Sequence, residues 1–78
     1  MDFNSLHQRF YDELCNQTGS YSYDLEVDRN SAELYRGGTG THAIVSYYIE
    51  EGPVFVMDGG QHRTPEKAAQ YVAKNYNL

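Results

Sequence analysis

Three carboxylates recur at every second position between residues 21 and 28, which read Tyr-Ser-Tyr-Asp-Leu-Glu-Val-Asp. Asp24, Glu26 and Asp28 alternate with apolar side chains, which is the period of a β-strand with one face on a core and the other in water. In such a strand the carboxylates stand in one row, about 6.8 Å apart. A row of this kind attracts cationic partners through its electric field. We therefore expect an acidic row on the outer face of a sheet.

Further side chains are expected on the same outer face. In the strand predicted at residues 32–36, Glu33 and Tyr35 alternate with apolar residues, and the strand predicted at 42–50 adds more outward positions. Tyrosine is enriched where proteins dock. The alternative is that the face is simply solvated, as most surface charge is. The candidate partner-binding residues are Asp24, Glu26, Asp28, Glu33, Tyr35, Ile44, Tyr48 and Glu50, with His42 beside them.

A second candidate site combines a glycine-rich turn with two basic side chains. Asp58-Gly59-Gly60 is followed by His62 and Arg63, immediately before a predicted helix start. Because exposed N–H groups at a helix N-terminus favour anions, His62 and Arg63 are candidate anion-binding residues. The alternative is an ordinary loop that leads from a strand into a capped helix.

Other motifs do not support catalysis or metal binding. The glycine-rich segment at residues 37–40 lacks the lysine and the following helix of a phosphate-binding loop, so a hairpin loop is expected there. The three histidines and the single cysteine, Cys15, lack the close spacing of zinc ligands. No nucleophile elbow is present, and a row of carboxylates on an open strand is no glycosidase cleft. We expect no enzyme activity, no cofactor and no metal.

The charge balance restricts the class of partner. Lysine and arginine number 6 and aspartate and glutamate number 11, which gives a formal net charge of −5. Nucleic-acid binding normally depends on a surplus of basic side chains, so direct binding to DNA or RNA is disfavoured. An acidic chain suits either a basic protein partner or solubility alone. The lone cysteine, the absence of a signal-peptide pattern and the lack of a long apolar segment predict a cytoplasmic protein outside the membrane.

Two helices are predicted to position the candidate sites. The first covers residues 3–17 and ends at Gly19, with Asn4 or Ser5 as its N-cap. The second begins at Pro65, with Thr64 as N-cap. The expected apolar stripes are Phe3, Leu6, Phe10 and Leu14 in the first helix, and Ala68, Tyr71, Val72 and Tyr76 in the second.

Four strands are predicted between these helices, at residues 21–28, 32–36, 42–50 and 54–57. Their short connections favour antiparallel pairing, and both helices are expected on one face of the sheet. The prediction is one α+β domain spanning residues 1–78, a two-layer sandwich with the order α-β-β-β-β-α.

This order of elements resembles that of the double-stranded RNA-binding domain, which runs helix, three strands, helix and places lysines at the start of its last helix. At that place this chain has Arg63 and Lys67, with Pro65 and Glu66 between them. The resemblance implies nucleic-acid binding as an alternative function.

In size and acidic character the chain is also similar to phage-encoded inhibitors of bacterial defence or transcription, anti-CRISPR proteins included. Regularly spaced carboxylates can imitate a phosphate backbone and compete for a nucleic-acid-binding surface. We therefore predict a small inhibitor or adaptor that binds a basic protein surface. A homodimer subunit, paired through an edge strand or the sheet face, is a further alternative, so monomer and homodimer both stay open.

Overall fold

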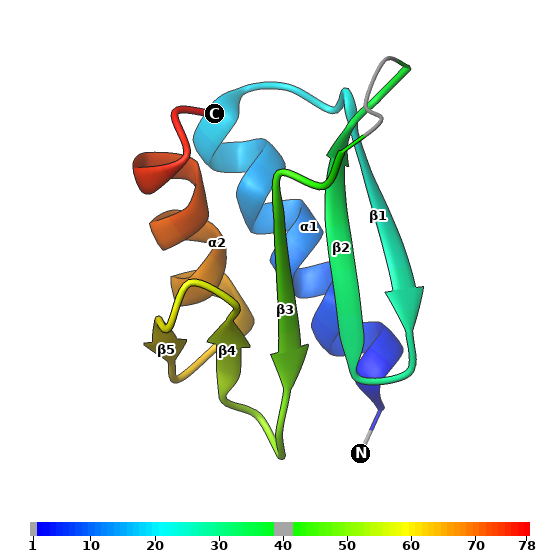
Figure 1. Cartoon of the computed structure of the whole chain (residues 1–78), viewed down its shortest axis with the longest axis vertical. Coiled ribbons are helices and arrows are strands. Elements are labelled where there is room, and N and C mark those ends of the chain that lie inside the picture. The colour runs from blue at the N-terminus through cyan, green and yellow to red at the C-terminus, as the bar shows by residue number, and fades with distance from the viewer. Residues whose placement is uncertain (1, 39–41) are drawn as a thin grey trace.

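The computed structural model describes residues 2–38 and 42–78. Its elements are α1 (Phe3–Thr18), β1 (Tyr23–Asp28), β2 (Ser31–Arg36), β3 (Val45–Ile49), β4 (Val54–Val56), β5 (Gln61–His62) and α2 (Pro65–Asn75). The strands form one antiparallel sheet in the order β1-β2-β3-β4-β5, and both helices cover the same face of it (Figure 1). The predicted two-layer α+β architecture is confirmed, and the described part of the chain has five strands in place of the predicted four.

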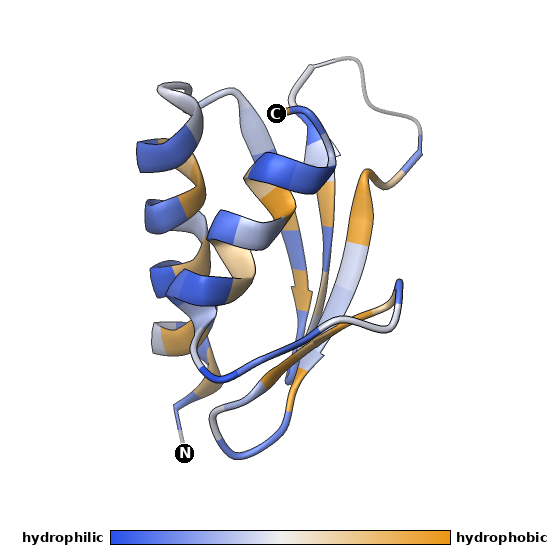
Figure 2. Cartoon of the chain, turned by 90° about the vertical axis from the view of Figure 1, so that its left-hand side faces the viewer, coloured by the Kyte–Doolittle hydropathy of each residue, from blue (hydrophilic) through white to orange (hydrophobic). Residues whose placement is uncertain are grey.

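The core lies between the sheet and the helices. In α1, Phe10 and Leu14 are fully buried, and Phe3 and Leu6 pack against them partly buried. The buried residues of α2 are Ala68, Ala69 and Val72, while Tyr71 and Tyr76 are partly buried. In Figure 2 both helices lie on the same side of the sheet and turn hydrophilic residues away from it. The two apolar stripes predicted from periodicity are thus the faces that meet the sheet.

The N-cap of α1 differs from the prediction. Asp2 is the cap, because its Oδ1 accepts the backbone N–H groups of Asn4 and Ser5 at 3.1 and 3.4 Å. A carboxylate at this position also suits the positive end of the helix dipole. Gly19 ends the helix as predicted: its φ of 71° is left-handed, and its N–H donates to the carbonyl of Cys15.

The hairpin between β1 and β2 fixes the register of the acidic strand. Arg29 and Asn30 form a two-residue turn, with Asp28 opposite Ser31, and Arg29 has a φ of 56°. Residue 21 was predicted inside the strand, but β1 begins at Tyr23 and Tyr21 is 78% exposed. β3 is likewise shorter than the predicted span of 42–50.

Gly37 follows β2 and passes close to the chain that enters β1. Its N–H donates to the Ser22 carbonyl at 2.6 Å, and a β-carbon at this position would collide with that carbonyl oxygen. Glycine is therefore required by close approach of two backbones. The predicted loop continues through residues 39–41, which lie outside the described residues.

The fifth strand was not predicted. β5 consists of Gln61 and His62, which pair with Phe55 and Val54 of β4. Two residues are too few to show a period of two, so the sequence reads there as a loop. Within residues 2–38 and 42–78, neither helix combines the length and the apolar character that a membrane crossing needs.

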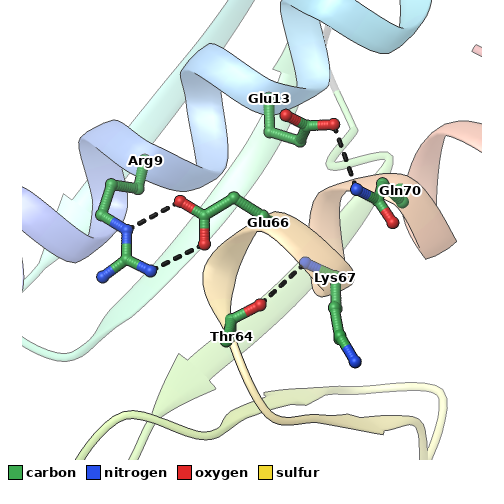
Figure 3. Close-up of polar contacts among 6 residues, drawn as sticks. All are labelled: Arg9, Glu13, Thr64, Glu66, Lys67 and Gln70. Atoms are coloured by element: carbon green, nitrogen blue, oxygen red, sulfur yellow. Dashed lines mark hydrogen bonds and ion pairs between the residues drawn. The ribbon is translucent and has the colours of Figure 1, made fainter.

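Polar contacts also join the exposed sides of the two helices (Figure 3). The guanidinium of Arg9 donates twice to the carboxylate of Glu66, both at 2.7 Å, and Gln70 donates to Glu13 at 3.2 Å. Such exposed pairs contribute little to the free energy of unfolding.

Candidate functional site

The strand register gathers six of the eight predicted partner-binding residues on the sheet face opposite the helices. Asp24 lies opposite Tyr35, and Glu26 lies opposite Glu33. The intervening residues, such as Tyr23 and Leu34, are buried against the helices, so the paired residues point outward. We call the surface formed by Asp24, Glu26, Asp28, Glu33, Tyr35 and Tyr48 the acidic sheet face.

The carboxylates of the acidic sheet face, Asp24, Glu26, Asp28 and Glu33, are exposed. Among residues 2–38 and 42–78, the one ion pair joins Arg9 to Glu66, away from this face. Glu26 and Glu33 are direct cross-strand neighbours, an arrangement that destabilises a sheet because like charges repel. The face therefore presents an unneutralised negative field that a cation can relieve.

Tyr35 responds to this field. Partial burial raises the pKa of its phenol, and the nearby carboxylates of Glu33 and Glu26 raise it further. The negative neighbours act by disfavouring the phenolate, which adds another negative charge to the face. Tyr35 therefore stays a neutral hydroxyl at the end of the acidic row.

The far side of the acidic sheet face is aromatic. The ring of Tyr48 stacks on Phe55 of β4, with 5.0 Å between ring centroids and 11° between planes. Tyr48 is 36% exposed, and Met57 beyond it is 66% exposed. Sequence reasoning missed Phe55 and Met57 because residues 54–57 read as one continuous apolar run. The signal that could have found Phe55 is the alternation of the strand: once β4 pairs with β3, Phe55 lies opposite Tyr48 and shares its outward face.

A hollow of about 300 Å³ connects the acidic and aromatic sides. Its walls mix carboxylates with an aromatic ring and a thioether. A lysine or arginine fits such a surface, because its aliphatic stem packs on apolar groups while its charged end reaches carboxylates. The residues that line it include Glu26, Asp28, Glu33, Ser46, Tyr48 and Met57.

Three residues that were expected on this face lie outside the paired strands. Ile44 precedes β3, packs partly buried against the core, and donates its N–H to the Leu34 carbonyl. Glu50 follows β3, and its N–H donates to the carbonyl of Pro53 in the next turn. His42 is exposed ahead of β3. The acidic sheet face is therefore smaller than the strand prediction implied.

No protein-family model, curated protein or solved structure matches the chain.

The structure separates the two candidate anion-binding residues. The ring of His62 packs on Tyr71 with 4.6 Å between centroids, and burial lowers its pKa. Arg63 is exposed at the approach to α2. Thr64 accepts the Lys67 N–H, and the carboxylate of Glu66 already lies in the first turn. The anion site stays a prediction. The carboxylate of Glu66 in the first turn of α2 already supplies a negative charge at this helix start.

A neighbouring polar cluster was not predicted. Asp58 accepts the hydroxyls of Tyr71 and Tyr76 at 2.5 and 2.8 Å, and its Oδ1 accepts the Gly60 N–H at 2.9 Å. These bonds lower the pKa of Asp58, the bond from Tyr71 most of all. The cluster ties the turn between β4 and β5 to α2, which is a structural role.

The single thiol of the chain lies in an environment that disfavours its reactivity. Cys15 is buried, and burial raises the pKa of its thiol, so the reactive thiolate is disfavoured. Within the described parts of the chain, no three His, Cys, Asp or Glu side chains are grouped so that they could hold a metal ion.

Proposed function

We propose that this protein is a small interaction module, an inhibitor or adaptor, that binds a basic protein through its acidic sheet face. The observation that supports this most is the direct pairing of Glu26 with Glu33 beside the uncompensated carboxylates of β1. Natural sheets avoid like charges in this position, so their presence suits a surface that a cationic partner neutralises.

The partner class follows from the shape and sign of the face. Carboxylates spaced along a strand resemble the charge pattern of a nucleic-acid backbone, and a nucleic-acid-binding protein surface is complementary to it. The aromatic side, with Tyr48 stacked on Phe55, adds the kind of side chain that concentrates binding energy at protein interfaces. A basic, nucleic-acid-binding protein is therefore the proposed partner.

Double-stranded RNA binding is not favoured by the geometry around α2. Lys67 and Arg63 are exposed there, but Glu66 lies between them and pairs with Arg9. With a net charge of −5, the chain gains little from counterion release on RNA.

The test compares two double variants that change the net charge equally. Glu26→Lys with Glu33→Lys alters the acidic sheet face, whereas Asp12→Lys with Glu51→Lys alters exposed carboxylates elsewhere. Each folded variant and the wild type are used for affinity capture from source-cell extract at low and high salt. We expect the face variant alone to lose a basic protein that duplex DNA or RNA also displaces from the wild type. Retention by both double variants, or the absence of any basic protein bound to the wild type, contradicts the proposal.

A further inference from the structure

β1 is an edge strand whose outer backbone groups are directed by its pairing with β2. No other described strand lies on its far side. The Gly37 N–H donates to the carbonyl of Ser22. The backbone N–H and C=O groups of even-numbered residues in β1 therefore point toward β2, and those of odd-numbered residues point toward the free edge. The hydroxyl of Tyr11 donates to the carbonyl of Tyr23 at 2.7 Å from that outer side, which agrees with this parity.

The backbone groups of Leu25 and Val27 therefore point to the open edge. A groove of about 500 Å³ runs beside them, between β1 and α1, and its walls include Gln8, Tyr11, Leu25 and Val27. Val27 is 43% exposed although it lies on the core side of the sheet. Unpaired strand groups next to open apolar side chains form the kind of edge that accepts an added strand.

We propose that an extended basic segment of the partner pairs antiparallel with β1 as a sixth strand. Its apolar residues lie over Leu25 and Val27 in the groove, and its alternate lysines or arginines lie beside the carboxylates of β1. This inference rests on the proposed function for the charge of the partner, and it adds the binding mode and the edge where binding occurs.

The same carboxylates argue against a second copy of this chain as the occupant. Two β1 strands paired at their edges bring Asp24, Glu26 and Asp28 of one copy next to those of the other. Like charges in neighbouring strands are destabilising, whereas lysine or arginine at the same positions is attracted. The free edge of β1 therefore favours a basic segment over the β1 strand of a second copy.

The probe is a synthetic nine-residue peptide in which lysine and valine alternate, with lysine at both ends. Amide hydrogen exchange of the isotope-labelled protein is followed by NMR with and without peptide. In the free protein we expect fast exchange at Leu25 and Val27 and slow exchange at Asp24 and Glu26. The peptide should slow exchange at Leu25 and Val27 by about tenfold or more, as new hydrogen bonds require.

Matched peptides separate strand pairing from simple charge attraction. In the proposed antiparallel pair the valine N–H groups face β1, so N-methylation of the valines should abolish protection. N-methylation of the lysines should leave it intact. A peptide of the same composition with its lysines and valines in two blocks should bind without protecting Leu25 or Val27.

A pair of protein variants tests the edge from the other side. Val27→Pro removes an N–H that faces the free edge and keeps the bonds to β2, while Val27→Thr keeps the donor. We expect the proline variant to bind the alternating peptide about tenfold more weakly than the threonine variant. Equal affinity of the two variants, binding without protection of Leu25 and Val27, or no binding at low salt overturns the inference. The proposed function then still depends on its own result, the loss of the basic protein by the Glu26→Lys, Glu33→Lys variant.

Discussion

The imidazole of His7 and the phenol of Tyr47 form a buried hydrogen bond of 2.8 Å between α1 and β3. The other ring nitrogen, Nε2, lies 2.8 Å from the carbonyl oxygen of Arg29, which can only accept. Nε2 therefore carries the hydrogen, and in a neutral ring Nδ1 accepts the Tyr47 hydroxyl. His7 thus links α1 to the central strand and to the turn that fixes the register of β1.

Replacing Tyr47 by phenylalanine removes the hydroxyl and leaves the buried Nδ1 of His7 without its partner. We expect the free energy of unfolding to fall by about 1–3 kcal/mol, the usual cost of an unsatisfied buried group. Urea unfolding followed by circular dichroism measures it. Tyr48→Phe changes the neighbouring, partly exposed tyrosine and should stay within about 0.5 kcal/mol of the wild type. Equal losses for the two variants would show that the His7 bond is unimportant.

Glu33→Gln should stabilise the fold while it weakens partner binding. The substitution removes the repulsion with Glu26 across the strand pair. We expect a gain in the free energy of unfolding of about 0.5 kcal/mol at low ionic strength, which disappears in high salt. Binding to the captured basic protein should weaken in the same variant. Unchanged stability at low salt would mean that the two carboxylates do not interact.

Tyr48→Ala should weaken binding of the basic protein by about tenfold or more, since aromatic side chains at the centre of an interface carry much of its energy. Tyr21→Ala is the matched control, because Tyr21 is also exposed but precedes β1 and is not one of the residues that form the acidic sheet face. Calorimetric titration of the captured partner measures both affinities. If Tyr21→Ala weakens binding as much as Tyr48→Ala, the aromatic side of the face is not where the partner docks.

Asp58 should make stability depend on acid pH. Hydrogen bonds from Tyr71, Gly60 and Tyr76 lower its pKa in the folded state below the ordinary value of 3.8. A carboxyl group whose pKa is lower in the folded state stabilises the fold at pH values above its pKa in the unfolded state. This contribution is lost as the pH falls through the pKa of the folded state. The free energy of unfolding, measured from neutral to acid pH, should therefore change less with pH in Asp58→Asn than in the wild type. Parallel profiles for the two proteins would show that Asp58 is not coupled to folding.

Local signals made much of the fold predictable from the sequence. The helix at the C-terminal end is specified by Thr64 as cap and Pro65 at the first helical position, and both act as expected. The outward parity of Asp24, Glu26 and Asp28 follows from strict alternation, and those side chains are exposed.

Other features depend on contacts that no local pattern records. Asp2, Asn4 and Ser5 are all good caps, and only the position of the first helical turn on the core selects Asp2. The pairing of Glu26 with Glu33 requires the register set by the hairpin turn. The bond between His7 and Tyr47 joins residues forty positions apart, so only the tertiary fold shows it.

The most direct measurement is NMR mapping of the captured basic protein on the isotope-labelled chain. We predict that backbone amide shifts change most at Glu26, Glu33, Ser46 and Tyr48 and along the free edge of β1, and that high salt reverses them. Changes concentrated on the exposed sides of the helices, or at Arg63 and Lys67, would contradict binding through the acidic sheet face.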